Sequence, residues 1–164
     1  MENGLVFQKK QSSMSMENYL QRIDIQSSIR DGRLEQILDS YDENILRDDI
    51  FKNVCLEAGS LMLDHLVHYK IEEEFEKEGN ERSRSVIFHM KNIMIYILYD
   101  RVPSDDVPEK VIKNYNDTIE TLRQISKGKL FINLPKKEID SNGDGIGDKP
   151  STLFKWGGET PRRF

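Results

Sequence analysis

Residues 48–70 read DDIFKNVCLEAGSLMLDHLVHYK, and this stretch indicates the fold class more strongly than any other part of the sequence. Its apolar residues recur at steps of three and four over about five turns, so they form one continuous stripe along a helix. A strand could not place them on one face, because its side chains point alternately to opposite faces. The stretch therefore predicts a long helix that packs against other helices. The stripe consists of Ile50, Phe51, Val54, Cys55, Ala58, Leu61, Met62, His65, Leu66 and Tyr69.

Two features of the same region concern the neighbours and the end of this helix. Gly59 lies inside it, where glycine costs up to about 1 kcal/mol relative to alanine, so we expect another helix to approach closely there. The helix is predicted to end in the charged run EEEFEKEGN, residues 72–80. We interpret the glutamates at 72–78 as a solvated helix end, with a cation site or an acidic docking face as the alternatives.

A second helix is predicted from a serine cap at Ser83 or Ser85 to about Tyr99. Its second half is apolar in nearly every direction, and a helix that is apolar all round is buried all round. We therefore expect this helix at the centre of the bundle. A shorter amphipathic turn precedes the long helix and carries Leu34, Ile37 and Leu38.

The last helix is predicted to begin at a cap formed by Asp105 or Asp106. Pro108 then lies in the first turn, where its missing N–H does no harm. Gly128 is predicted to end the helix in the left-handed conformation that glycine adopts readily.

These patterns predict an all-α protein, a small helical bundle with extended N- and C-terminal arms. The predicted boundaries are an N-terminal arm at 1–20, the bundle at 21–128 and a C-terminal arm with an Asp/Gly-rich loop at 129–164. The first arm has one small apolar cluster, and the second is rich in Gly, Pro, Lys and Asp beyond residue 136. Neither arm can form a hydrophobic core alone.

Composition limits the class of protein. The chain has 164 residues, 37% of them hydrophobic and 32% charged, which fits one folded domain. The single cysteine, Cys55, excludes an internal disulfide and fits a reducing compartment. The N-terminus has no apolar signal core, and the longest apolar run, residues 93–99, is far shorter than the ~20 residues that span a bilayer. We expect a soluble protein of cytoplasmic origin with no membrane partner.

The net charge of −5 bears on nucleic-acid binding. Affinity for a phosphate backbone comes largely from clustered lysine and arginine, so an acidic chain is not expected to grip DNA. A mildly acidic wall does suit a channel through which double-stranded DNA passes without specific binding.

Catalytic signatures are nearly absent from the sequence. It contains no phosphate-binding glycine loop, no nucleophile elbow and no zinc-protease helix motif. His65 and His68 have a spacing that could share a metal, but no further ligand pattern completes the set. Cys55 lies on the core stripe and is interpreted as a packed thiol. We expect no enzyme and no catalytic residues; a helical enzyme that uses His65 or Glu73 is the alternative.

Residues 140–148, DSNGDGIGD, form the most specific local motif. Oxygen ligands at alternate positions, folded back by a glycine, are how a short loop wraps a hard cation such as Ca²⁺. The loop resembles the aspartate-rich calcium loops of thrombospondin-type repeats, but Ser151 stands where an EF-hand has its bidentate glutamate. A plain Gly/Asp-rich turn is the alternative. The candidate metal ligands are Asp140, Asn142, Asp144 and Asp148.

The C-terminal residues 152–164, TLFKWGGETPRRF, combine large apolar side chains with arginines. Aromatic and arginine anchors dominate the energetics of many interfaces. We therefore predict a partner-binding arm; the alternative is an arm that folds back and caps its own bundle. The predicted partner-binding residues are Phe154, Trp156, Arg162, Arg163 and Phe164.

Three segments together carry a family resemblance: AGSLMLDHLVHYKI (58–71), ERSRSVIFHMKNIMIYILYDRVP (81–103) and PEKVIKNYNDTIETLRQISKGKL (108–130). Their order and spacing resemble a family of small helical head–tail proteins from Mu-like prophages. More loosely, they are similar to the head–tail connector, or adaptor, proteins of tailed bacteriophages. The residues that carry the resemblance are Tyr96, Leu98, Tyr99, Arg101, Pro108, Tyr115, Gly128, Lys129 and the terminal Arg162, Arg163 and Phe164.

The resemblance implies a structural protein of the virion neck, assembled in the cytoplasm of the host bacterium. Such adaptors form a ring, commonly twelvefold, below the portal protein, extend the DNA channel and dock the next neck or tail protein. Two alternatives remain open: a tail-completion or terminator protein, and a helical Ca²⁺-responsive binding module. The Asp-rich loop and the longer arms depart from the family pattern.

Overall fold

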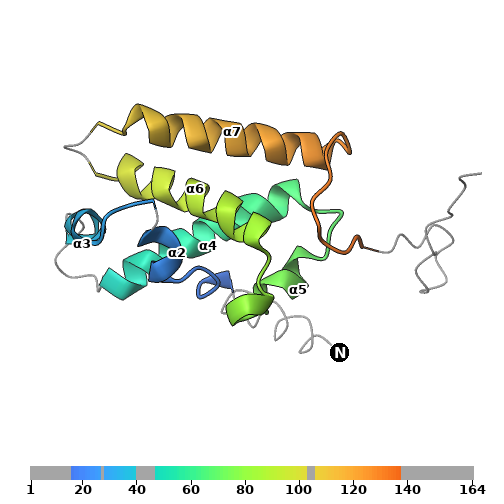
Figure 1. The fold of residues 1–164 in the computed structure, drawn as a ribbon, viewed down its shortest axis with the longest axis horizontal. Coiled ribbons are helices and arrows are strands. Elements are labelled where there is room, and N and C mark those ends of the chain that lie inside the picture. Colours follow the sequence, from blue (N-terminus) through green and yellow to red (C-terminus); the bar gives the residue numbers. More distant parts are fainter. Residues whose placement is uncertain (1–15, 27, 40–46, 103–105, 138–164) are drawn as a thin grey trace, which may run out of the picture.

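The computed structural model describes residues 16–26, 28–39, 47–102 and 106–137, and within these ranges the chain is helical without any strand (Figure 1). The prediction of an all-α bundle is therefore confirmed. None of the described helices has the length and apolar character that a membrane-spanning helix needs. The elements are α2 (Arg22–Gln26), α3 (Asp31–Asp39), α4 (Arg47–His65), α5 (Ile71–Phe75), the 3-10 turn η1 (Gly79–Glu81), α6 (Arg84–Asp100) and α7 (Glu109–Ser126).

Helix α6 is the central element of the bundle, as its all-round apolar character predicts. It packs against α2, α3, α4 and α7, and Figure 1 shows it running between α4 and α7. Each large side chain removed from water in this way contributes roughly 1.5–3 kcal/mol before the loss of conformational entropy. The buried residues of α6 are Val86, Met90, Asn92, Ile93, Met94, Ile95, Leu98 and Tyr99.

Helix α4 buries most of the predicted stripe, but it ends at His65 rather than in the glutamate run. The chain turns at Leu66, and a separate short helix, α5, carries the glutamates. The turn is stabilised by backbone pairing with a distant segment: Lys70 N–H donates to Pro135 C=O at 2.8 Å, and Lys137 N–H donates to His68 C=O at 2.9 Å. These tertiary bonds replace the helical ones, so the helix ends before its apolar stripe does.

The residues just before α2 belong to the core, although the sequence placed residues 1–20 in an arm. Met16, Tyr19 and Leu20 are buried. Gly59 on α4 makes room for Met16, because a Cβ atom built on Gly59 would lie 2.5 Å from both Cγ and Sδ of Met16. The close approach predicted at Gly59 is thus confirmed. The nearest neighbour of Gly59 is Met16, which belongs to residues 16–21, the N-terminal segment, and Met90 of α6 lies beside it.

Helix α7 begins at Glu109, directly after Pro108, which occupies the N-cap position. The prediction that Asp105 or Asp106 is the N-cap residue is therefore wrong. Asp106 lies exposed before the helix, and Asp105 is outside the described residues. The end of the helix agrees with the prediction: Gly128 has φ +70° directly after the C-cap residue, Lys127. The buried residues of α7 are Thr118, Ile119, Leu122 and Ile125.

The first part of the predicted C-terminal arm also packs on the bundle. Ile132 and Leu134 are buried, and Lys136 forms an isolated antiparallel bridge with Tyr69. Residues 129–137 therefore cover the end of the bundle where α4 and α7 finish. The helical prediction for Leu34, Ile37 and Leu38 is also confirmed, since all three are buried on α3.

The close fit at Gly59 predicts that Gly59→Ala changes the free energy of unfolding in opposite directions in two backgrounds. In the natural chain, Gly59→Ala should lower the free energy of unfolding by about 1 kcal/mol, because overpacking against Met16 outweighs the gain in helix propensity. In the Met16→Ala background the same substitution should raise it, because the new methyl group then has space. Urea denaturation of the four proteins measures this coupling. Equal effects of Gly59→Ala in both backgrounds would contradict the packing described here.

Candidate interaction surfaces

The residues predicted from sequence to bind metal or partners lie outside the described part of the chain. The four candidate ligands of the Asp-rich loop are Asp140, Asn142, Asp144 and Asp148. The five candidate anchors of the C-terminal arm are Phe154, Trp156, Arg162, Arg163 and Phe164. Both sets stay predictions.

The described residues contain no group of three or more His, Cys, Asp or Glu side chains that could hold a metal ion. His65 is half-buried at the C-terminal end of α4, and His68 is exposed in the turn that follows. Among the described residues, the histidine pair has no third side chain that could complete a metal site.

Cys55 is a buried thiol in the middle of α4. Its Sγ atom lies 3.3 Å from the backbone carbonyl oxygen of Met16, to which it donates. Burial raises the pKa of Cys55 to about 11, so the thiol stays protonated near neutral pH. A protonated, inaccessible thiol is a poor nucleophile, and the prediction of a packed cysteine is confirmed.

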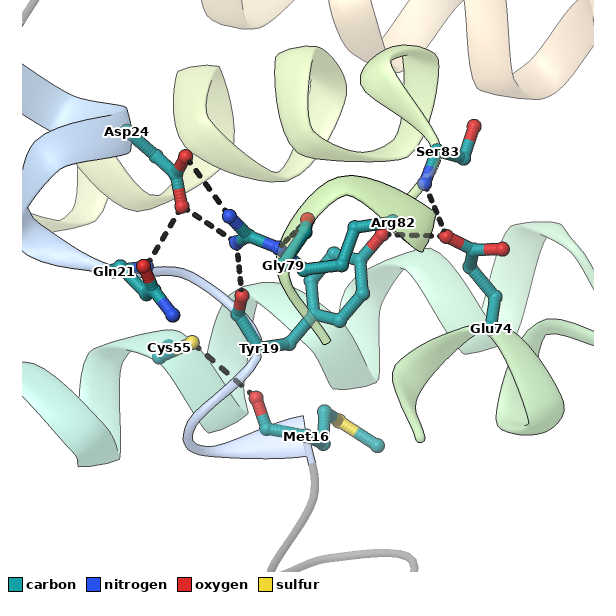
Figure 2. Close-up of polar contacts among 9 residues, drawn as sticks. All are labelled: Met16, Tyr19, Gln21, Asp24, Cys55, Glu74, Gly79, Arg82 and Ser83. Atoms are coloured by element: carbon teal, nitrogen blue, oxygen red, sulfur yellow. Dashed lines mark hydrogen bonds and ion pairs between the residues drawn. The ribbon is translucent and has the colours of Figure 1, made fainter. Parts of the chain in front are cut away.

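Glu74 is the residue that the sequence analysis missed. It was interpreted as part of a solvated glutamate run, but it is 1% exposed. Its carboxylate accepts hydrogen bonds from Tyr19 Oη at 2.7 Å and from Ser83 N–H at 2.5 Å (Figure 2). It also accepts a hydrogen bond from Lys77 Nζ at 2.8 Å. The sequence did hold a signal: Ile71, Glu74 and Phe75 follow helical spacing, so Glu74 lies on the apolar face of α5.

Arg82 forms the second half of this polar network. Its guanidinium donates to the Asp24 carboxylate at 2.7 Å, to the Tyr19 carbonyl oxygen at 2.7 Å and to the Gly79 carbonyl oxygen at 3.1 Å (Figure 2). The side chains of Arg82 and Asp24 are only 8% and 12% exposed. The network therefore joins the N-terminal segment to α2, α5, η1 and the start of α6.

The chemistry of this network is structural. Burial, together with the hydrogen bond to Glu74, raises the pKa of Tyr19, so its hydroxyl remains a neutral donor. The Glu74 and Arg82 side chains are occupied by partners from the same chain. A carboxylate with three donors is a fixed anchor rather than a free general base.

Helices α6 and α7 meet through a polar and an aromatic contact. Asn92 donates through its amide to Thr118 Oγ1 at 3.1 Å, and the rings of Tyr96 and Tyr115 stack with centroids 4.1 Å apart. A cleft of about 150 Å³ opens beside this contact. It is lined by Ser28, Asn92, Ile95, Lys110, Val111 and Asn114.

A second opening, which we call the basic groove, lies where α4 and α7 end. Its volume is about 240 Å³. Lys136 from its wall lies over the ring of Phe131, with Nζ 5.4 Å from the ring centroid, and Phe131 is itself 78% exposed. The groove is lined by Val67, His68, Tyr69, Ile125, Ser126, Gly128, Lys136 and Lys137.

A comparison with protein-family models places these features in a known group. The family described as Bacteriophage Mu, Gp36 matches residues 19–147, which is well over half of the chain. The chain belongs to the bacteriophage Mu Gp36 family. The resemblance to Mu-like prophage proteins is therefore confirmed. None of the curated proteins matches the chain, and none of the solved structures does.

The Mu Gp36 match begins at Tyr19, the first residue of the buried polar network, and covers every helix from α2 to α7. It also covers the walls of the basic groove. The C-terminal residues 152–164 lie beyond the matched range. The match also extends beyond the described residues to Gly147, so it includes Asp140, Asn142 and Asp144 of the Asp-rich loop. The expectation that this loop departs from the family pattern is therefore wrong for residues 140–147.

The buried position of Glu74 predicts that its replacement by alanine destabilises the protein far more than the same change at the neighbouring Glu73. Glu74→Ala should lower the free energy of unfolding by about 3 kcal/mol, because the buried Tyr19 hydroxyl and Ser83 N–H lose their acceptor. The matched control is Glu73→Ala, which removes an exposed carboxylate with a single lysine contact and should change stability by less than about 0.5 kcal/mol. Urea denaturation measures both, and similar losses in the two variants would contradict the role of Glu74.

His89 predicts a loss of stability in mild acid. Its Nδ1 atom is buried without a hydrogen-bond partner among the described residues, and burial lowers the pKa of the imidazole. The unfolded chain therefore takes up a proton at this position at a higher pH than the folded chain. The contribution of neutral His89 to the free energy of unfolding is complete above about pH 6.5 and is lost as the pH falls below that value.

The test is the pH dependence of the free energy of unfolding between about pH 7 and pH 5. His89→Leu should make this dependence shallower. Ile23→Leu, at an exposed position of α2, retains the histidine and its ring contact with Phe88 and should keep the slope of the natural chain. An unchanged slope in His89→Leu would refute the assignment.

Proposed function

We propose that this Mu Gp36 family protein is a non-enzymatic structural component of the phage particle, and more specifically the head–tail connector. In this role it forms a ring below the portal protein, extends the DNA channel and docks the next neck or tail protein. Membership of a bacteriophage Mu family is the observation that carries the proposal. A twelvefold ring is the expected stoichiometry, because rings of that size are common among adaptors.

The distribution of exposed apolar residues supports a protein that works by contact. Large apolar side chains reach the surface on separate elements: Ile23 on α2 is 66% exposed, Phe88 on α6 is 53% exposed, and Phe131 after α7 is 78% exposed. A ring subunit needs two different faces for its sister copies and further faces for the layers above and below. Apolar residues spread over several elements meet that requirement better than one concentrated patch would.

The interior supports the same proposal. Cys55, Glu74 and Arg82 are largely buried, and each is held by partners that join elements of the bundle. A substrate site would need such groups to face a cavity. The net charge of −5 is compatible with a channel that DNA traverses without being gripped.

Deletion of the gene from its phage, with complementation in trans, tests the proposal. Loss of a connector should yield DNA-filled heads and finished tails that fail to join, as counted by electron microscopy. A tail terminator, the nearest alternative, would instead leave tails of uncontrolled length. Joined infectious particles in the deletion strain, or particles from which the protein is absent, would overturn the proposal.

A further inference from the structure

The basic groove stands out in an acidic protein. Residues 121–137 contain five cationic side chains and no acidic one, whereas the whole chain has a net charge of −5. Only Lys137 among these cations forms an ion pair within the described residues, with Glu72 at 2.9 Å. The cationic residues are Arg123, Lys127, Lys129, Lys136 and Lys137.

Exposed apolar surface accompanies this charge. Val67, which lines the groove, is 50% exposed, and Phe131 lies against Lys136 of the groove wall. A phosphate backbone would use the cations but would leave Phe131 and Val67 in water. A protein surface with carboxylates around an apolar side chain would use both kinds of group.

The chain itself carries such a surface, which we call the acidic face. It consists of the exposed Glu76, Glu78 and Glu81 with the exposed Ile23 of α2. The Arg82–Asp24 ion pair, with a 2.7 Å separation, holds α2 beside the end of η1. Ile23 and Glu81 are the sequence neighbours of the two paired residues. The acidic face therefore combines exposed carboxylates with an exposed apolar side chain.

We propose that the basic groove of one copy binds the acidic face of a second copy. Figure 1 shows α7, whose end lines the groove, and α2, which carries Ile23, on different sides of α6, so the two surfaces are distinct. A contact between different faces is heterologous and, when the rotation closes, produces a ring. The inference rests on the proposed ring function and names the contact that builds the ring.

Charge reversal on each surface gives a decisive test. One variant carries Lys127→Glu and Lys136→Glu in and beside the groove, and the other carries Glu78→Lys and Glu81→Lys on the acidic face. Each protein alone should self-associate about 100-fold more weakly than the natural chain, because attraction becomes repulsion. An equimolar mixture should recover assembly, since each altered surface meets its opposite charge. Sedimentation velocity and native mass spectrometry measure the assembly state.

The matched control is the Lys110→Glu and Lys113→Glu variant, which makes the same change in net charge at the start of α7 and should assemble like the natural chain. The inference is overturned if the groove variant assembles normally, if the mixture fails to recover, or if the natural chain stays monomeric at millimolar concentration. A groove variant that loses binding to duplex DNA or to the portal protein, but keeps self-association, would assign the groove to that partner instead. These results are separate from the deletion phenotype, which tests the place of the protein in the particle.

Discussion

Helix α6 is apolar around most of its circumference, and the rest of the bundle follows from the need to cover it. Two long helices, α4 and α7, both pack against α6 and also contact each other, and the short α2 and α3 complete the cover. Met16 enters the remaining space between α4 and α6, where Gly59 leaves room for it. The N-terminal segment is thus part of the enclosure of α6, because without it the facing sides of Gly59 and Met90 would meet water.

The polar network of Tyr19, Asp24, Glu74 and Arg82 holds the N-terminal segment against residues 71–83, where there is no long helix to pack against. Residues 71–83 contain only a short helix and a single 3-10 turn, which have little intrinsic stability. Glu74 and Arg82 fix this stretch to the N-terminal segment through Tyr19 and Asp24. Buried polar groups of this kind are costly unless every partner is present, so the network favours one arrangement of the chain.

The sequence predicted what depends on local pattern and failed where distant segments compete. The extent of α6 and the left-handed Gly128 follow from periodicity and glycine chemistry. The end of α4 does not, because Lys70 pairs with Pro135, a residue 65 positions away in the chain. Glu74 was missed because a run of like charges normally lies in water, although its spacing from Ile71 and Phe75 placed it on a buried face. The groove could not be predicted, since three separate segments build it.

The same constraint is consistent with the proposed function, in which the surface of the bundle makes the contacts. The described core is filled by side chains that cover α6, and its buried polar groups are committed to joining segments. What remains on the surface is a segregated charge pattern: residues 121–137 contain cations and no acidic residue, and exposed glutamates lie along residues 73–81. Within one copy, Lys137 pairs with Glu72 and Glu73 pairs with Lys70, whereas no ion pair joins Arg123, Lys127, Lys129 or Lys136 to another described residue. The proposed contact between the basic groove of one copy and the acidic face of the next would place opposite charges together and cover Phe131 and Ile23. Burial of these apolar side chains would then supply affinity, and the charges would fix the relative orientation of the two copies.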